Sequence, residues 1–265
     1  MRKLTVQMLV AIKVIYESQS LKNLNNKTIK SLIDRGLIVD GQLSDEGKIL
    51  ALSKMKLSHQ CQELSLDLIE IHLNYQGPPE LAALQHFQQE GYIGSVLEGN
   101  FILTVVKALI LDKLEEYSSF YSRKDACVGF LHGQLVVNQN NIADIISSIS
   151  KISRNKFISN MTEIVNEPLV QQFYPGISLD IAIALFDAVD LSIFEKIAIK
   201  LAENPYEYSK GWPDLTIIKD NEIRLIEIKT TDKLHASQLK TIPILREILP
   251  FEISVCKIKN LNKVT

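Results

Sequence analysis

The spacing of apolar residues predicts short helices and a small hairpin at the start of the chain. Residues 4–17 place apolar side chains at helical spacing, and a second helical stretch covers Asn26 to Arg35. A hairpin is predicted over residues 37–43, because Asp40-Gly41 at its centre suits a turn with positive φ. Ser44 then provides an N-cap for a third helix.

The order helix, helix, hairpin, helix is similar to a winged helix. In that fold the second helix would present Lys27, Lys30 and Arg35 to the phosphates or the groove of DNA. The alternative is a small helical packing or protein-interaction module whose lysines are simply solvated. The sequence leaves both interpretations open.

A break near residue 76 divides the chain into two predicted domains. Apolar residues over 58–75 suggest a connecting helix, which ends before Gln76-Gly77-Pro78-Pro79, the clearest interruption of the pattern. We therefore expect a winged-helix-like DNA-binding domain over residues 1–75 and a second domain over residues 76–265.

The first part of the second domain is predicted to be mostly helical. Helices are expected over residues 80–90, 100–116, 141–150 and 178–202, with a break at Gly91 to Gly94. The helix over 100–116 has the pattern of a long amphipathic helix.

Beyond Pro205 the period of the pattern changes from helical to two. Residues 214–218 and 223–228 alternate as strands, and the polar residues between them predict a turn, so this segment is a β-hairpin. A helix over residues 236–249 and a strand over 251–258 complete the chain.

Composition excludes several classes of protein. Hydrophobic residues make up 46% and charged residues 23%, the values of an ordered globular chain. Cys61, Cys127 and Cys256 lie too far apart for a CxxC pair or a zinc cluster, so we expect buried, free thiols. No apolar run approaches the ~20 residues of a membrane span, and Lys13 and Glu17 interrupt the apolar stretch that a signal peptide would need. A cytoplasmic protein without a membrane partner is expected.

The predicted hairpin carries side chains suited to phosphodiester hydrolysis. Side chains alternate along a strand, so Glu227 and Lys229 share one face, and the hairpin brings Asp214 close to them. Two carboxylates are hard oxygen ligands for Mg²⁺ or Mn²⁺, and the backbone carbonyl of Ile228 would add another ligand. Lys229 would orient the attacking water or neutralise developing charge.

The motif of Asp214, Glu227 and Lys229 is short enough to arise by chance, but the residues around it support its interpretation as a site. Glu227 and Lys229 stand in an otherwise apolar strand, where burial without a partner or a metal would be costly. The formal net charge is only −2, so nucleic-acid binding would have to use local basic patches. Lys210 and Arg224 flank the predicted site and are candidates for phosphate contacts. His86 and His235 are isolated and receive no catalytic role.

Several segments together resemble a known nuclease family. The phrases GWPDL (211–215) and LIEIK (225–229), followed by Asp232, Leu234 and Gln238, are similar to the virus-type replication-repair nuclease (VRR-NUC) domain of the PD-(D/E)XK superfamily. The upstream segment LQHFQQEGYIG (84–94), ending in LEGN (97–100), is similar to the Fanconi-associated nuclease branch. The resemblance covers residues 80–260, with a poorly matching middle.

The resemblance implies further site residues and a fold. The pair Glu98-Gly99 would supply the first acidic ligand, so the implied site is Glu98, Asp214, Glu227 and Lys229, with Gln238 in support. The interval from Lys229 to Gln238 is one residue shorter than the family pattern, and a tryptophan expected after Gln238 is absent, which leaves the position of that helix in doubt. The implied fold is α/β, a nuclease core with a mixed sheet flanked by helices and a helical insertion.

The resemblance implies a metal-dependent deoxyribonuclease acting on 5′-flap or branched DNA in repair or replication. Its helical insertion implies a monomeric core, with a homodimer left open. One alternative is a DNA-binding regulator or scaffold with an inactive nuclease fold, although all four site positions are intact. Another is a nuclease toxin or defence nuclease that uses the same site.

Overall fold

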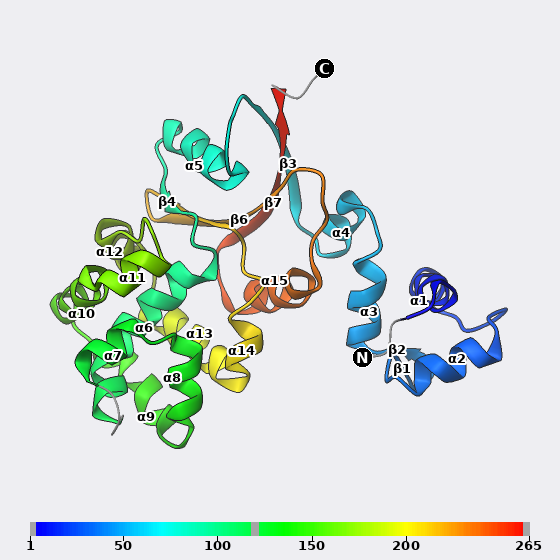
Figure 1. The fold of residues 1–265 in the computed structure, drawn as a ribbon, viewed down its shortest axis with the longest axis horizontal. Coiled ribbons are helices and arrows are strands. Elements are labelled where there is room, and N and C mark those ends of the chain that lie inside the picture. Colours follow the sequence, from blue (N-terminus) through cyan, green and yellow to red (C-terminus); the bar gives the residue numbers. More distant parts are fainter. Residues whose placement is uncertain (1–3, 118–121, 262–265) are drawn as a thin grey trace.

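The centre of the protein is a five-stranded mixed sheet, seen in a computed structural model that describes residues 4–117 and 122–261 (Figure 1). The outermost residues of both predicted domains, 1–3 and 262–265, lie outside this description. The strand order is β3-β7-β6-β5-β4, with bounds β3 Asp67–Leu73, β4 Ile93–Ser95, β5 Leu215–Lys219, β6 Glu222–Lys229 and β7 Glu252–Asn260. The expected mixed sheet flanked by helices is confirmed.

Strands β5 and β6 form the predicted hairpin. Leu215 pairs with Ile226, and the turn residues Asp220 and Asn221 have φ values of 49° and 66°. Aspartate and asparagine tolerate this left-handed conformation better than other side chains. Strands β6 and β7 are parallel, so the chain crosses over between them through helix α15, Ala236–Ile248.

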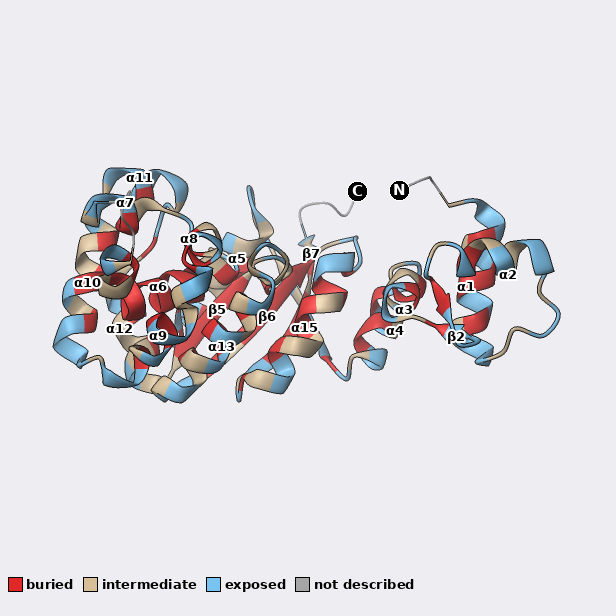
Figure 2. Cartoon of the chain, turned by 90° about the horizontal axis from the view of Figure 1, so that it is seen from below, coloured by how far each residue is buried: buried red, intermediate tan, exposed pale blue. Residues whose placement is uncertain are grey.

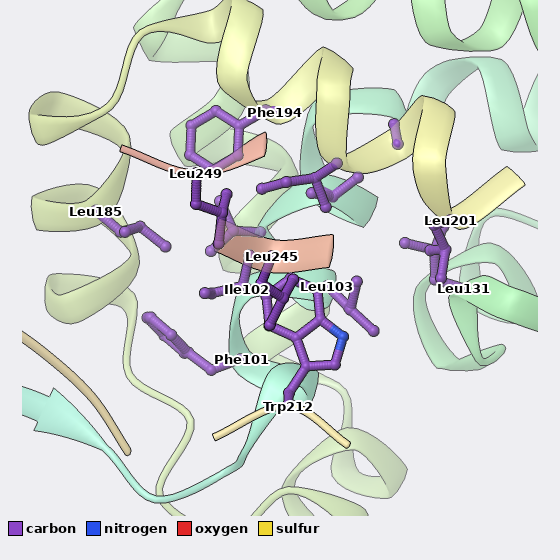
Figure 3. Packing of buried hydrophobic residues seen from close by; sticks show 14 of the residues in the cluster. Phe101, Ile102, Leu103, Leu131, Leu185, Phe194, Leu201, Trp212, Leu245 and Leu249 are labelled. Atoms are coloured by element: carbon purple, nitrogen blue, oxygen red, sulfur yellow. The ribbon is translucent and has the colours of Figure 1, made fainter. Parts of the chain in front are cut away.

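Each face of the sheet is covered by helices. Helix α5 (Pro79–Gln89) covers one face, where Phe87 packs with Ile226 and Ile228. The opposite face carries Leu225 and packs against a large helical layer, of which Figure 3 shows the core side chains. This layer consists of α6 Gly99–Glu116, α7 Arg123–Val128, α8 Leu131–Val137, α9 Ile142–Ser147, α10 Arg154–Asn166, α11 Pro168–Phe173, α12 Leu179–Ala188, α13 Leu191–Glu203 and α14 Pro205–Tyr208, with 3₁₀ turns at Gln139–Asn141 and Ile149–Lys151.

Helix α6 is the axis of the helical layer. It was expected to be amphipathic, but its side chains are buried on every side from Phe101 to Leu111 (Figure 2). The reason is that the other helices surround it, which makes it a core helix rather than a surface one. Within the described residues, no helix has the length and apolar character that crossing a bilayer demands.

The N-terminal part forms its own small core. Helices α1 (Val6–Ser18) and α2 (Asn26–Ile33) pack with the hairpin β1 (Ile38–Val39) and β2 (Gln42–Leu43) and with helix α3 (Asp45–Leu52). The turn residues Asp40 and Gly41 both have positive φ, and Ser44 Oγ accepts the N–H of Gly47, as the sequence predicted. Helix α4 (Leu57–Glu63) follows.

The predicted connecting helix over residues 58–75 is wrong in its second half. The helix α4 ends at Glu63, and residues 67–73 form β3, an edge strand parallel to β7. The segment DLIEIHL alternates as an edge strand does, but β7, the strand with which it pairs, lies almost 190 residues later. The predicted boundary near residue 76 therefore falls between a strand of the central sheet and the helix that follows it.

A buried amide joins α4 to the loop that follows β6. Gln60 is fully buried, and its Oε1 accepts the N–H of Leu234 at 2.8 Å. Its Nε2 donates to the carbonyls of Leu52 at 2.9 Å and Leu234 at 3.3 Å. The glutamine therefore supplies buried hydrogen bonds to both the N–H and the carbonyl of Leu234 in the loop after β6.

We expect Gln60→Ala to lower the free energy of unfolding by about 1–3 kcal/mol, because the buried Leu234 N–H loses its acceptor. Urea unfolding followed by circular dichroism measures this. Gln62→Ala, at an exposed position of the same helix, is the matched control and should change stability little. Equal effects of the two substitutions would contradict this role of Gln60.

Candidate active site

The hairpin β5–β6 places Asp214 opposite Glu227. Leu215 pairs with Ile226, so one step further along the antiparallel register Asp214 faces Glu227 on the side of the helical layer. Glu227 is fully buried and Lys229 is 4% exposed, and Lys229 Nζ lies 2.6 Å from Glu227 Oε1. The structure therefore brings these three side chains together, as their alternation predicted.

Asp214 is held by the backbone of the strand across from it. The N–H of Ile228 donates to Asp214 Oδ2 at 2.7 Å. In an antiparallel ladder the N–H and C=O of one residue point to the same side, so the carbonyl of Ile228 also faces Asp214. Glu227, Ile228 and Asp214 thus present oxygen atoms to a shared region.

Trp212 brings Glu98 to the same region. A Cβ atom on Gly99 would lie only 2.3 Å from the indole ring, so the backbone at Gly99 packs directly against Trp212. Trp212 is buried in the helical core, and its Nε1 donates to the carbonyl of Tyr208 at 2.8 Å (Figure 3). The N–H of Glu98 donates to the carbonyl of Asp214 at 3.3 Å. The segments EG and GWPD are therefore fixed to each other.

Glu98 has an unusual backbone conformation for its residue type. Its φ of 50° and ψ of −146° lie outside the regions that residues with a Cβ prefer, and its side chain makes no capping bond to α6. Such strain costs about 1–3 kcal/mol and persists where surrounding contacts impose it. Here the packing of Gly99 on Trp212 and the hydrogen bond from the Glu98 N–H to the Asp214 carbonyl hold the backbone at this position.

Gln238 reaches the site because two segments of backbone pack closely together at Gly211. Gly211 has a φ of 77°, and a Cβ there would lie 2.4 Å from the carbonyl of Ser237. This contact brings the first turn of α15 against the GWPD segment, and Gln238 Nε2 donates to Glu227 Oε1 at 2.5 Å. Gln238 Oε1 accepts the N–H of His235, which completes the helix cap. The structure thus gives Gln238 a position that the shortened spacing left in doubt.

Burial, reinforced by neighbouring acids, raises the pKa of each carboxyl group in the site. Burial first, and then the charge of Asp214, raise the pKa of Glu227 to about 8. Burial also raises the pKa of Asp214. Glu98 lies at the exposed mouth of the site, and its pKa is raised first by desolvation and then by the charges of Asp214 and Glu80. Burial opposes the charge of Lys229, but Glu227 and Asp232 outweigh it and raise the pKa of that lysine.

Two neighbours of the site were not assigned from the sequence. Glu80, in the first turn of α5, is close enough that its charge raises the pKa of both Glu98 and Asp214. An acid in a first helical turn is also ordinary dipole complementation, so the sequence carried no signal for it. Asp232 Oδ2 lies 3.4 Å from Lys229 Nζ and holds the lysine from the solvent side.

The candidate phosphate-binding residues fall in different places. Lys210 is exposed and directly precedes Gly211. Arg224, expected to flank the site, lies apart from it, because it is three residues from Glu227 on the opposite face of β6 and pairs with Glu222 and Glu252. Lys27 and Lys30 are exposed on α2, whereas Arg35 is half-buried just beyond the end of that helix.

The oxygen atoms of the site are of the type that binds a hard divalent cation, but the carboxylates do not already form a complete metal-binding cluster. Among residues 4–117 and 122–261, no group of three or more His, Cys, Asp or Glu side chains is arranged to hold a metal ion. The strand register places the carboxylates of Asp214 and Glu227 opposite each other, and the Ile228 N–H that binds Asp214 puts this residue beside them. Glu227 Oε2 is buried without a hydrogen-bond partner, which is the kind of atom a cation would satisfy.

Comparisons with known proteins support the fold. No protein-family profile matches the chain, and no curated protein matches it in sequence. A crystal structure of paFAN1 bound to 2nt 5′-flap DNA with gap is similar, with a TM-score of 0.59 and 14% identity over 95% of this chain and 48% of that chain. A second, of paFAN1 bound to 1nt 5′-flap DNA with gap, gives 0.53 and 13% over 95% and 46%. The chain spans about half the length of these structures, and at such identity the likeness shows the fold alone.

We expect Gly99→Ala to destabilise the protein by about 1–3 kcal/mol, because the new methyl group would overlap the Trp212 ring. Trp212 is the only tryptophan, so its fluorescence should shift in the folded variant. Gly133→Ala, in α8 with no atom within 4 Å of a new Cβ, is the control and should be neutral or stabilising by up to ~1 kcal/mol. Thermal unfolding compares the two. An unchanged melting temperature for Gly99→Ala would contradict the packing described.

The metal-free protein should lose stability as pH rises through the titration of Glu227. The unfolded chain releases this proton near pH ~4.3, whereas the folded protein holds it to about 8. Between these values the folded state binds more protons, so the free energy of unfolding falls with rising pH. In EDTA, Glu227→Gln should weaken this dependence between pH 5 and 8, measured by urea unfolding. The exposed Glu46→Gln should leave the dependence unchanged.

Proposed function

We propose that the protein is a metal-dependent, structure-selective DNA nuclease that hydrolyses phosphodiester bonds. The observation that carries this proposal is the fully buried Glu227 carboxylate, which contacts Lys229 and faces Asp214 across the hairpin. With its pKa raised to about 8, this buried carboxyl becomes ionised at neutral pH only if a nearby cation compensates its charge. The arrangement therefore supports chemistry rather than packing.

Each side chain has a distinct part in the proposed reaction. Asp214, Glu227 and the Ile228 carbonyl would hold one Mg²⁺ or Mn²⁺, with Glu98 as a further ligand from the mouth of the site. Bound there, the cation would supply charge stabilisation for a phosphate oxygen and favour a hydroxide-like nucleophile at neutral pH. Lys229 would place its ammonium beside the attacking water or the developing charge.

Gln238 and Asp232 position these groups rather than react. Gln238 would fix the orientation of Glu227 through Oε1, and Glu227 Oε2 is left buried without a hydrogen-bond partner. Asp232 holds Lys229 from the opposite side at 3.4 Å. Such outer contacts set the rotamers on which a reacting geometry depends.

The preferred substrate we propose is DNA with a 5′ flap or branch. The similar solved structures are of paFAN1 bound to 5′-flap DNA, and the likeness in fold covers 95% of this chain. The N-terminal helices and hairpin that precede β3, which we interpret as winged-helix-like, would bind a duplex arm through the exposed Lys27 and Lys30. Lys210 lies beside the site and would contact a phosphate.

The test is cleavage of labelled 5′-flap, 3′-flap, nicked, four-way and single-stranded DNA in Mg²⁺ or Mn²⁺. We expect wild-type protein to cut the 5′ flap best, and Asp214→Ala and Lys229→Ala to lower the rate about 100-fold or more. The exposed Lys196→Ala, on α13, is the matched control and should cut normally. Thermal unfolding of every variant separates lost chemistry from lost folding.

Each alternative predicts a different outcome of that experiment. Binding of flap DNA without cleavage in either metal would favour an inactive nuclease fold that acts as a regulator or scaffold. Cleavage of all duplex and single-stranded substrates at equal rates would favour a toxin or defence nuclease and would contradict structure selectivity. Cleavage that persists in Asp214→Ala would contradict the assigned site.

A further inference from the structure

Exposed aromatic side chains gather at one place on the helical layer. Among the residues that the structure describes, Phe130, Phe173 and Tyr206 are the only exposed Phe, Tyr or Trp side chains, at 47%, 52% and 55%. They come from three separate segments: the start of α8, the end of α11, and α14. Grouped aromatic rings that remain in contact with water mark a binding surface, whereas single exposed apolar residues do not.

Ring contacts join these residues into one continuous surface with His132 and Tyr174. Phe130 stacks on His132, with centroids 5.5 Å apart and planes at 17°, and His132 lies 5.0 Å from Tyr206. Phe130 also lies 5.8 Å from Phe173 and 6.4 Å from Tyr174. We call these five residues the aromatic ridge.

The aromatic ridge lies beside segments of the chain that lead into the candidate site. The Tyr174 hydroxyl donates to Asn100 Oδ1 at 3.5 Å, and Asn100 lies two residues after Glu98. Tyr206 belongs to α14, which packs beside α8 and leads directly into the segment that carries Asp214 (Figure 1). A strand lying along the ridge would therefore pass the mouth of the site.

One exposed cation, Lys210, lies beside the ridge, close enough that its charge acts on His132. A recess of about 300 Å³ is lined by Tyr206, Lys210 and Lys240, together with neighbouring residues of α14 and α15. Lys210 is exposed, whereas Lys240 is paired with Glu207 at 2.6 Å. Burial, and then the charge of Lys210, lower the pKa of His132, so its ring is uncharged at neutral pH and presents an ordinary π-face.

We propose that the aromatic ridge is a stacking platform for the unpaired bases of a single DNA strand held next to the site. Every base has a π-face, so aromatic rings bind single strands with little regard to sequence, while nearby cations follow the phosphates. Bases within a duplex are already stacked on one another and cannot use such a surface. The ridge thus deepens the proposed nuclease function, on which it rests, by giving the unpaired strand a defined path.

Equilibrium binding to fluorescent strands of about ten nucleotides tests the platform, within the usual site sizes of such surfaces. One strand is oligo-dT and the other is an abasic strand with the same phosphates, and EDTA excludes cleavage. We expect Phe130→Ala and Tyr206→Ala each to weaken oligo-dT binding about five-fold or more, the loss of roughly one stacked base. Neither substitution should alter the weaker binding of the abasic strand.

Two kinds of control separate stacking from structure. Phe130→Trp and Tyr206→Phe keep a ring and should retain oligo-dT binding. Leu169→Ala removes an exposed apolar side chain from α11 outside the ridge and should also bind as wild type does. All the substituted positions are exposed, so the melting temperatures should stay close to that of the wild-type protein.

Three results would overturn the platform. The first is oligo-dT binding by the alanine variants at wild-type strength, and the second is equal binding of oligo-dT and abasic strands by the wild-type protein. The third is a change of oligomeric state on Phe130→Ala in sedimentation experiments, which would assign the ridge to contacts between copies of the chain. Failure of the wild-type protein to cut flap DNA would refute the proposed function but would not alter these binding results.

Discussion

Two close backbone approaches, each possible only at a glycine, hold the candidate site together. The backbone at Gly99 packs on the Trp212 ring, and Gly211 lies against the carbonyl of Ser237, in both cases nearer than any Cβ would allow. These contacts join three segments that are far apart in sequence: the start of α6, the loop before β5, and the first turn of α15. Without a side chain at either position, the carboxylates can share one region.

Burying charged side chains at the site costs folding free energy that an apolar core would not lose. Glu227 is fully buried beside Lys229 and opposite Asp214, and its pKa rises to about 8 because burial and a like charge both oppose its ionised form. A buried pair is seldom more stable than well-packed apolar residues of similar size. The hydrogen bond from Gln238 and the contact with Lys229 satisfy one oxygen of Glu227, which leaves the other without a protein partner.

The helical layer serves both the core and the surface. Around the buried helix α6 it supplies the apolar face on which the sheet packs, and it also holds Glu98 at the site. On its outer side the same helices display the aromatic ridge, whose members meet only because α8, α11 and α14 converge. One packed unit therefore positions both the acidic residues of the candidate site and the aromatic ridge.

The sequence by itself determined features that depend on local periodicity. Alternation predicted the β5–β6 hairpin and the shared face of Glu227 and Lys229, and the turn at Asp40-Gly41 followed from local φ preferences. Only the tertiary structure decided features that depend on distant partners. Strand β3 was mistaken for a helix because β7, its partner, comes much later in the chain, and the roles of Glu80 and Gln60 were missed for the same reason. Local spacing fixes which way a side chain points, but burial and contact arise from segments that meet only in the folded chain.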